Sequence, residues 1–249
     1  MLNLMQLLIF ELGRECNLSE RHKNVCPITY MPRGKEQLTD DVIIKTVGEA
    51  YNSLMFTGFI GWHFYNEPML YNERMLSLMV RIRQQIPQSR FLLWTNGTIL
   101  IKDSRMALFE CTFISNYFKK DPNEFVGYFN NIMINEGGET LLDNRIQHFM
   151  VNGNNNSCGV PFESFLIGND GTTYMCCHDW RNDIKIGNIL FTGLSDLASK
   201  KWEYVKEISG KQMTGNAPET CLRCNAKYSG IADFDLNISN KAKVEIGKL

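Results

Sequence analysis

Cysteines in two separate stretches are the residues of this sequence best suited to chemistry. In the stretch ECNLSERHKNVC, Cys16 and Cys26 flank a single histidine, His22. The late cysteines, of which the last two form a CxxC pair, are Cys158, Cys176, Cys177, Cys221 and Cys224. A CxxC turn can direct two thiolates at one metal, so the late cysteines can supply four ligands to zinc or to an iron–sulfur cluster. The early stretch fits either a metal centre or two core cysteines beside an exposed histidine.

Two further motifs follow apolar runs that have the character of strands. The run GWHFYNEPML ends in Asn66, Glu67 and Pro68, and the run FLLWTNGTIL ends in Thr95 and Asn96. A carboxylate and an amide at a strand end can hold an ammonium or hydroxyl group, and the fixed φ of proline shapes the turn that presents them. Because Asn-Gly and Glu-Pro turns are common, neither motif assigns a function by itself.

The elements that must position these residues alternate between short apolar runs and amphipathic runs. This pattern is typical of β/α units and not of a helical bundle or a β-sandwich. Thr39 is the expected N-cap of the first helix. Parallel strand–helix–strand units cross over right-handedly, so the sequence predicts a partial parallel β/α barrel with its chemistry at the carboxyl ends of the strands. The predicted strands are 5–10, 59–64, 90–94, 111–115 and 146–151, and the predicted helices are 39–55, 72–86, 102–109 and 122–133.

The character of the chain changes near residue 151. The stretch 152–159 reads NGNNNSCG and is expected to be a loop, and the stretch 163–177 is expected to be a β-hairpin that closes on Asn169-Asp170-Gly171. A helix over 194–208 then leads to the CxxC pair. We therefore expect a barrel in residues 1–150 and a small hairpin and helix domain that carries the late cysteines in residues 151–249.

Composition and charge give no support to several classes of protein. With 26 basic and 27 acidic side chains among 249 residues, the net charge is −1, which gives no sign of a nucleic-acid partner or an anionic membrane surface. No run reaches the roughly 18–20 apolar residues of a membrane span. The apolar start MLNLMQLLIF lacks a basic leader, so it is expected to be the first strand of a cytoplasmic protein. Cytoplasmic cysteines are kept reduced, which favours metal binding or catalysis over disulfides, although the isolated Cys111 is expected to be a core residue.

Taken together and in this order, the motifs resemble a family. A cysteine motif after the first strand, YNEP after the second and TNG after the third resemble a radical S-adenosylmethionine enzyme. The late cysteines resemble the twitch or SPASM extension, which many of these enzymes carry for an auxiliary cluster. The resemblance implies S-adenosyl-L-methionine and two 4Fe–4S clusters as cofactors, one cluster binding S-adenosylmethionine and one auxiliary.

The resemblance also assigns roles to individual positions. Cys16 and Cys26 match the first and last cysteines of the family's cluster motif. Asn66, Glu67 and Pro68 match the turn that holds the amino group of S-adenosylmethionine, and Thr95 and Asn96 match a strand end near the same cofactor. The auxiliary ligands match Cys158, Cys176, Cys221 and Cys224, with a spacing that favours Cys176 over Cys177.

The chain departs from the family at its first cluster motif. The family shows CxxxCxxC, whereas no cysteine lies between Cys16 and Cys26. Glu20, His22 and Lys23 are the candidates for the third ligand. A protonated lysine cannot ligate and a carboxylate suits iron–sulfur iron poorly, whereas neutral imidazole suits iron well, so we predict His22 as the ligand. Replacing a thiolate with a neutral donor should raise the reduction potential of the cluster.

The resemblance implies a 5′-deoxyadenosyl radical that takes hydrogen from a small polar substrate, most economically in a dehydrogenase-type oxidation. A flavodoxin or ferredoxin would supply electrons. His178 and Asp179 are candidates for an acid–base pair in the substrate pocket. Three alternatives stay open: a redox-neutral epimerase in which Cys177 returns a hydrogen atom, a peptide-modifying SPASM enzyme, and a non-catalytic zinc protein on a degenerate barrel.

Overall fold

An open sheet runs through the computed structural model, which describes residues 5–135, 163–213, 216 and 218–222. Its strand order is β5-β4-β3-β2-β1-β6-β7-β8, in which β5 to β6 pair in parallel and β7 and β8 add in antiparallel fashion. Because the described edge strands β5 and β8 do not meet, the expected partial barrel is confirmed. The strands are β1 Leu7–Phe10, β2 Phe59–Gly61, β3 Arg90–Thr95, β4 Phe109–Ser115, β5 Ile132–Asn135, β6 Ser164–Ile167, β7 Thr172–Tyr174 and β8 Gly187–Asn188.

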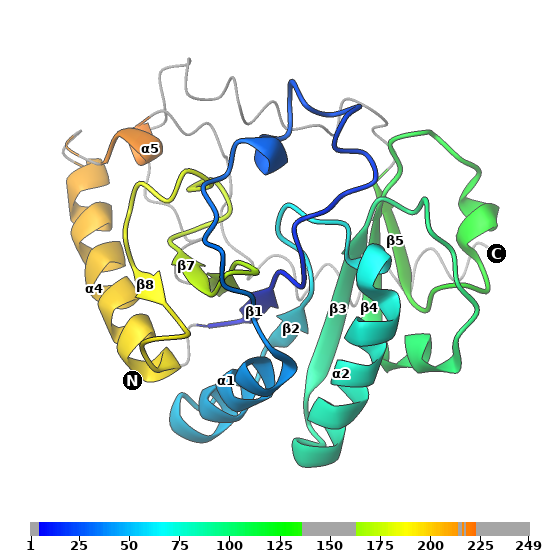
Figure 1. Cartoon of the computed structure of the whole chain (residues 1–249), viewed down its shortest axis with the longest axis horizontal. Helices are drawn as coiled ribbons and strands as arrows, with labels where there is room; N and C mark the ends of the chain where they lie inside the picture. The colour runs from blue at the N-terminus through cyan, green and yellow to red at the C-terminus, as the bar shows by residue number, and fades with distance from the viewer. Residues whose placement is uncertain (1–4, 136–162, 214–215, 217, 223–249) are drawn as a thin grey trace.

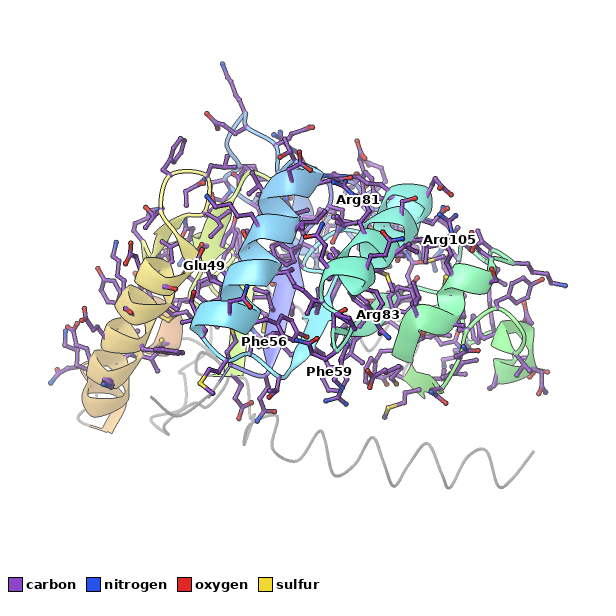
Figure 2. The ribbon with its side chains drawn as sticks, turned by 90° about the horizontal axis from the view of Figure 1, so that it is seen from below. Glu49, Phe56, Phe59, Arg81, Arg83 and Arg105 are labelled. Carbon is purple, nitrogen blue, oxygen red and sulfur yellow. The ribbon has the colours of Figure 1, made fainter. Side chains whose placement is uncertain are left out.

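Helices cover one face of this sheet. In Figure 2, α4, α1 and α2 lie in this order across the face, and Figure 1 shows the loop after β1, in blue, above the sheet with α1 and α2 below it. The predicted N-cap is confirmed, because Thr39 Oγ1 accepts a hydrogen bond of 3.3 Å from the Val42 amide. The α-helices are α1 Asp40–Ser53, α2 Asn72–Gln85, α4 Leu194–Met213 and α5 Glu219–Leu222, and the 3-10 helices are η1 Pro27–Thr29, η2 Pro68–Tyr71, η3 Ser104–Leu108 and η4 Pro122–Phe125.

Alternating side chains of the parallel strands build two separate cores. Leu8 and Phe10 of β1 pack into the larger core against the helices, whereas Leu7 and Ile9 belong to a second cluster on the inner face of the sheet. Parallel strands are buried on both faces, so near-continuous apolar runs are the expected sequence pattern. Cys16 and Cys26 pack against the inner cluster, so the fold brings the early cysteines to the concave side.

One predicted helix was wrong, and a second forms only a short 3-10 helix. The stretch 122–133 forms only the turn η4 and then enters β5, because Gly127 (φ 87°) and Asn131 (φ 47°) take left-handed conformations that interrupt a helix. The stretch 102–109 forms η3, after which β4 begins at Phe109. The second strand ends at Gly61, and the predicted strand 146–151 and loop 152–159 lie outside the described residues.

The predicted hairpin is confirmed, and it continues the barrel sheet. Strands β6 and β7 pair antiparallel, and β6 also pairs in parallel with β1. Gly171 lies at φ 82° in the turn, where glycine has no steric penalty, and Thr172 N donates 3.0 Å to Asp170 Oδ1. Consequently the segment after β7 leaves the sheet near the first strand. Within the described part of the chain, no helix is long and apolar enough to cross a membrane.

Candidate functional site

A cavity of about 160 Å³ lies where the second, third and fourth strands end. The loop after β1 contributes Cys16, His22 and Cys26 to its lining. The turns after β2 and β3 contribute Asn66, Glu67, Thr95 and Asn96, and aromatic or imidazole side chains add His63, Tyr65, Trp94 and Tyr117. The structure therefore gathers three separate sequence motifs around one space at the carboxyl ends of the strands.

The early cysteine stretch folds as a chain of turns that aligns His22 with Cys26. His22 N donates 2.9 Å to Leu18 O, and Cys26 N donates 2.8 Å to His22 O. Both side chains line the same cavity. His22 is only 5% exposed, and its ring meets the Tyr117 ring edge-on at 4.9 Å between centroids. His22 is therefore not the exposed loop histidine of the alternative interpretation.

The environment of Cys16 fits a thiol that ionises only with a metal. Burial raises the pKa of the Cys16 thiol to about 11, and the nearby charges of Glu67 and Cys26 also raise it. Bound iron supplies the positive charge that removes such a proton. The donor set of two thiols and one imidazole, in a pocket lined partly by aromatic side chains, thus suits an iron–sulfur cluster.

The same residues do not form a site for one ion. No group of three His, Cys, Asp or Glu within the described residues is close enough together to hold a single metal ion. Ligands of one zinc ion all lie about 2.0–2.3 Å from it, whereas a cluster of four irons accepts each ligand on a different iron.

Glu67 joins the second and third strand ends. Its carboxylate accepts hydrogen bonds from Thr95 Oγ1 (2.7 Å), Asn96 N (2.8 Å) and Met69 N (3.0 Å), and the side chain is 2% exposed. Burial raises the pKa of Glu67, while these hydrogen bonds oppose the rise. A carboxylate has about four acceptor positions, so Glu67 keeps about one for a ligand beyond these three donors.

The two asparagines of the turns differ in how well they are satisfied. Asn66 Oδ1 accepts 3.1 Å from Phe64 N, but its buried Nδ2 has no hydrogen-bond partner among the residues that the structure describes. A buried amide donor beside a cavity calls for an acceptor, and the carboxylate of an amino-acid-like cofactor would supply one. Asn96 Nδ2 instead donates 2.9 Å to Asn17 Oδ1, which anchors the cluster loop to the third strand.

The segment after β7 brings several late residues together. Tyr65 Oη donates 2.6 Å to Cys177 O, which ties this segment to the lining of the cavity. Burial raises the pKa of the Cys176 thiol well above its ordinary value, and the charges of Cys177, Asp179 and Cys221 raise it further, so these groups lie near one another. Cys158 and Cys224 lie outside the described residues.

His178 and Asp179 do not line the cavity. The Asp179 carboxylate accepts 2.8 Å from Asp183 N and 3.3 Å from Ile184 N, and burial raises its pKa to about 7. These hydrogen bonds of Asp179 order the local loop. The acid–base role of His178 and Asp179 therefore stays a prediction.

The structure shows a buried ion pair at the end of β1 that the sequence analysis did not predict. Glu11 is fully buried and accepts 2.8 Å from Arg33, which also donates 2.8 Å to Asn169 Oδ1. Glu11 is the inner-face residue that follows Ile9, so a carboxylate at the end of an apolar strand was the available signal. Arg33 could not be found this way, because its loop has no periodic pattern.

Comparisons with known proteins agree with this geometry. Residues 158–225 match the SPASM iron–sulfur cluster-binding domain. The resemblance of the motifs to the radical S-adenosylmethionine enzymes with a SPASM-type extension is confirmed.

A relative with a similar sequence is the S-adenosyl-L-methionine-dependent 2-deoxy-scyllo-inosamine dehydrogenase of Niallia circulans. It is 27% identical over 247 residues, which cover 89% of this chain and 93% of the relative. The structure of BtrN in complex with AdoMet and 2-DOIA matches with a TM-score of 0.67 and 21% identity over 90% of this chain and 94% of BtrN. BtrN in an open conformation matches with a TM-score of 0.62 and 20% identity over 91% and 94% of the two chains. These structures share the fold of this chain.

Proposed function

We propose that the chain is a radical S-adenosylmethionine oxidoreductase that oxidises a small polar substrate in a dehydrogenase-type reaction. The observation that carries this proposal is the gathering of Cys16, His22 and Cys26 with the two strand-end turns around one cavity. The relative's name adds a substrate class, a hydroxylated ring that bears an amine.

The residues of the cavity would divide the cofactors between them. Cys16, His22 and Cys26 would hold one 4Fe–4S cluster, and Asn66 and Glu67 would hold the amino-acid part of S-adenosyl-L-methionine. When bound, these cofactors supply a 5′-deoxyadenosyl radical that takes a hydrogen atom from a substrate carbon. The turns that carry Asn66 and Glu67 are tied to the third strand, so they would hold the cofactor in a fixed position with water excluded.

The auxiliary site explains why oxidation is favoured. Oxidation of an alcohol to a carbonyl removes a hydrogen atom from carbon, a proton from the hydroxyl group and one further electron. Four thiolates, from Cys158, Cys176, Cys221 and Cys224, would leave no iron open to the substrate, which suits a centre that accepts this electron.

We propose that the barrel spans residues 1–150 and that the auxiliary domain spans 151–249.

The electron that starts each turnover must come from outside the chain. A flavodoxin or ferredoxin in the cytoplasm is the partner we propose, because these proteins deliver single electrons at low potential. The net charge of −1 does not indicate a particular charge on the surface of that partner.

A redox-neutral epimerisation is the second candidate, and the position of Cys177 favours it. Cys177 packs against the inner-face cluster, and its carbonyl is held by Tyr65, which lines the cavity. A thiol in that place could return a hydrogen atom to the substrate.

Metal analysis of anaerobically reconstituted protein tests the proposal. Wild-type protein should hold about eight irons with matching sulfide, and about four should remain after Cys16→Ala with Cys26→Ala or after Cys176→Ala with Cys221→Ala. Cys111→Ala is the control, because Cys111 is a buried strand residue whose thiol donates to Asn131 O, and it should keep all the iron. Stoichiometric zinc without iron would overturn the proposal in favour of a metal-binding protein.

A further inference from the structure

A lysine of α4 is buried against strands β6 and β7. Lys201 is 1% exposed, and its ammonium donates hydrogen bonds to Ser164 O on β6 and, at 3.5 Å, to Tyr174 O on β7. The ammonium also lies 5.2 Å from the centre of the Phe165 ring. Lysine is almost never fully buried unless it is paired with an anion, so its position needs a cause.

Within the described part of the chain, the hydrogen bonds of Lys201 reach only neutral backbone carbonyls, and no carboxylate forms an ion pair with it. Burial lowers the pKa of Lys201 to about 8, and the nearby charges of Cys176, Cys177 and Asp179 raise it. Burial of a cation is unfavourable when no anion compensates it. Tyr174, whose carbonyl accepts from Lys201, precedes the proposed auxiliary ligand Cys176 by two residues, so the ammonium lies where the segment of that ligand begins.

The position of Lys201 in the helix shows that this burial is built into the sequence. Leu194, Leu197, Ala198 and Val205 form the buried face of α4, and Lys201 lies on the same face at helical spacing. A lysine in an apolar stripe is the signal that could have identified it from the sequence. The neighbouring Lys200 is exposed, so the two lysines form a matched pair in one helix.

We propose that Lys201 is the counter-charge of the auxiliary iron–sulfur cluster and that its buried ammonium raises the reduction potential of that cluster. The inference rests on the proposed function, in which the late cysteines hold a cluster. A centre with four thiolate ligands is anionic and becomes more negative on reduction, so a nearby fixed cation favours the reduced state. A higher potential makes the cluster a better acceptor for the electron that the substrate loses.

The test isolates the auxiliary cluster in the full chain. Cys16→Ala with Cys26→Ala removes the barrel cluster, and a potentiometric titration followed by electron paramagnetic resonance then reports one centre. Lys201→Gln keeps a donor for Ser164 O and removes the charge, so it should shift the midpoint to lower potential. Lys201→Arg keeps the charge and should stay near the wild-type midpoint, and Lys200→Gln is the exposed control that should leave it unchanged.

Each outcome decides the inference. An intact cluster with an unchanged midpoint in Lys201→Gln would overturn it and leave Lys201 as a clasp between β6 and β7. Loss of the cluster in Lys201→Gln but not in Lys201→Arg would support it, because arginine keeps the positive charge of Lys201 and glutamine does not. Loss in both variants would overturn it as a structural effect. Absence of auxiliary iron from the parent chain itself would instead refute the proposed function.

Discussion

Replacement of Thr95 by valine tests how the cofactor turns are held together. The Thr95 hydroxyl donates 2.7 Å to Glu67 Oε1 and accepts 3.2 Å from Gly97 N, and Thr95 is 4% exposed. Valine has nearly the same shape and suits a strand, so the change removes only the hydroxyl. A hydrogen bond to a charged group contributes about 1.5–3 kcal/mol, and leaving Gly97 N–H buried and unsatisfied costs about 1–3 kcal/mol. We expect Thr95→Val to lower the free energy of unfolding by about 2.5–6 kcal/mol, the sum of these two contributions.

Thr112 provides a control for this change in the adjacent strand. Thr112 is fully buried in β4, and its hydroxyl has no hydrogen-bond partner among the described residues. Removing a buried hydroxyl without a partner relieves a desolvation cost, so Thr112→Val should be neutral or stabilising by about 1 kcal/mol. Urea unfolding of the cluster-free protein, followed by fluorescence and circular dichroism with coincident transitions, measures both variants. A loss below about 0.5 kcal/mol in Thr95→Val, or a larger loss in Thr112→Val, would refute the role of Thr95.

Three further predictions concern helix docking, the third cluster ligand and the reaction. Glu49 of α1 (Figure 2) accepts hydrogen bonds of 3.0 Å from Leu194 N and 2.8 Å from Ser195 N at the start of α4. Partial burial alone would raise the pKa of Glu49, but these hydrogen bonds have the larger combined effect, so the pKa lies below its ordinary value. The stabilisation from the Glu49 carboxylate is therefore complete above its ordinary pKa and is lost as the pH falls through the lowered pKa. Glu49→Gln should lower the free energy of unfolding by about 0.5–1 kcal/mol at neutral pH, and urea unfolding should show that this difference vanishes in acid. A difference that stays constant with pH would contradict this role. His22→Ala should lose the barrel cluster, about four irons, and His22→Cys should keep it at lower potential; full iron in His22→Ala would remove His22 from the ligand set. With 2-deoxy-scyllo-inosamine as trial substrate in deuterated water, we expect a carbonyl product and one 5′-deoxyadenosine per turnover, whereas an isomer labelled with solvent deuterium and abolished by Cys177→Ala would establish the epimerase.

The parallel barrel strands could be predicted because their signals are local and strong. Apolar runs identified β1, β3 and β4, and Thr39 with two aspartates marked the start of α1. The helix predicted over 122–133 failed because Gly127 and Asn131 take left-handed backbone conformations that composition does not reveal. The pairing of β6 with β1 was also missed, since a long-range parallel contact leaves no local pattern.

The same contrast between local signals and long-range contacts applies to the candidate site. Motif order was enough to predict that Cys16, His22 and Cys26 meet Asn66 and the other strand-end residues, because parallel strands end at one edge of a sheet. Sequence could not show that Glu67 already accepts three hydrogen bonds within the protein. The burial of Lys201 likewise depends on where α4 docks, although its place in an apolar stripe indicated it.

Reductive cleavage of S-adenosyl-L-methionine is the measurement that tests the central claim most directly. Iron-loaded protein under anaerobic conditions with excess dithionite should release 5′-deoxyadenosine and methionine, and Cys26→Ala, which lacks a ligand beside the cavity, should release neither. Cys111→Ala should match the wild type, since Cys111 lies in the strand core. Absence of 5′-deoxyadenosine from fully loaded wild-type protein, or equal amounts from Cys26→Ala, would contradict the assignment of radical chemistry to this cavity.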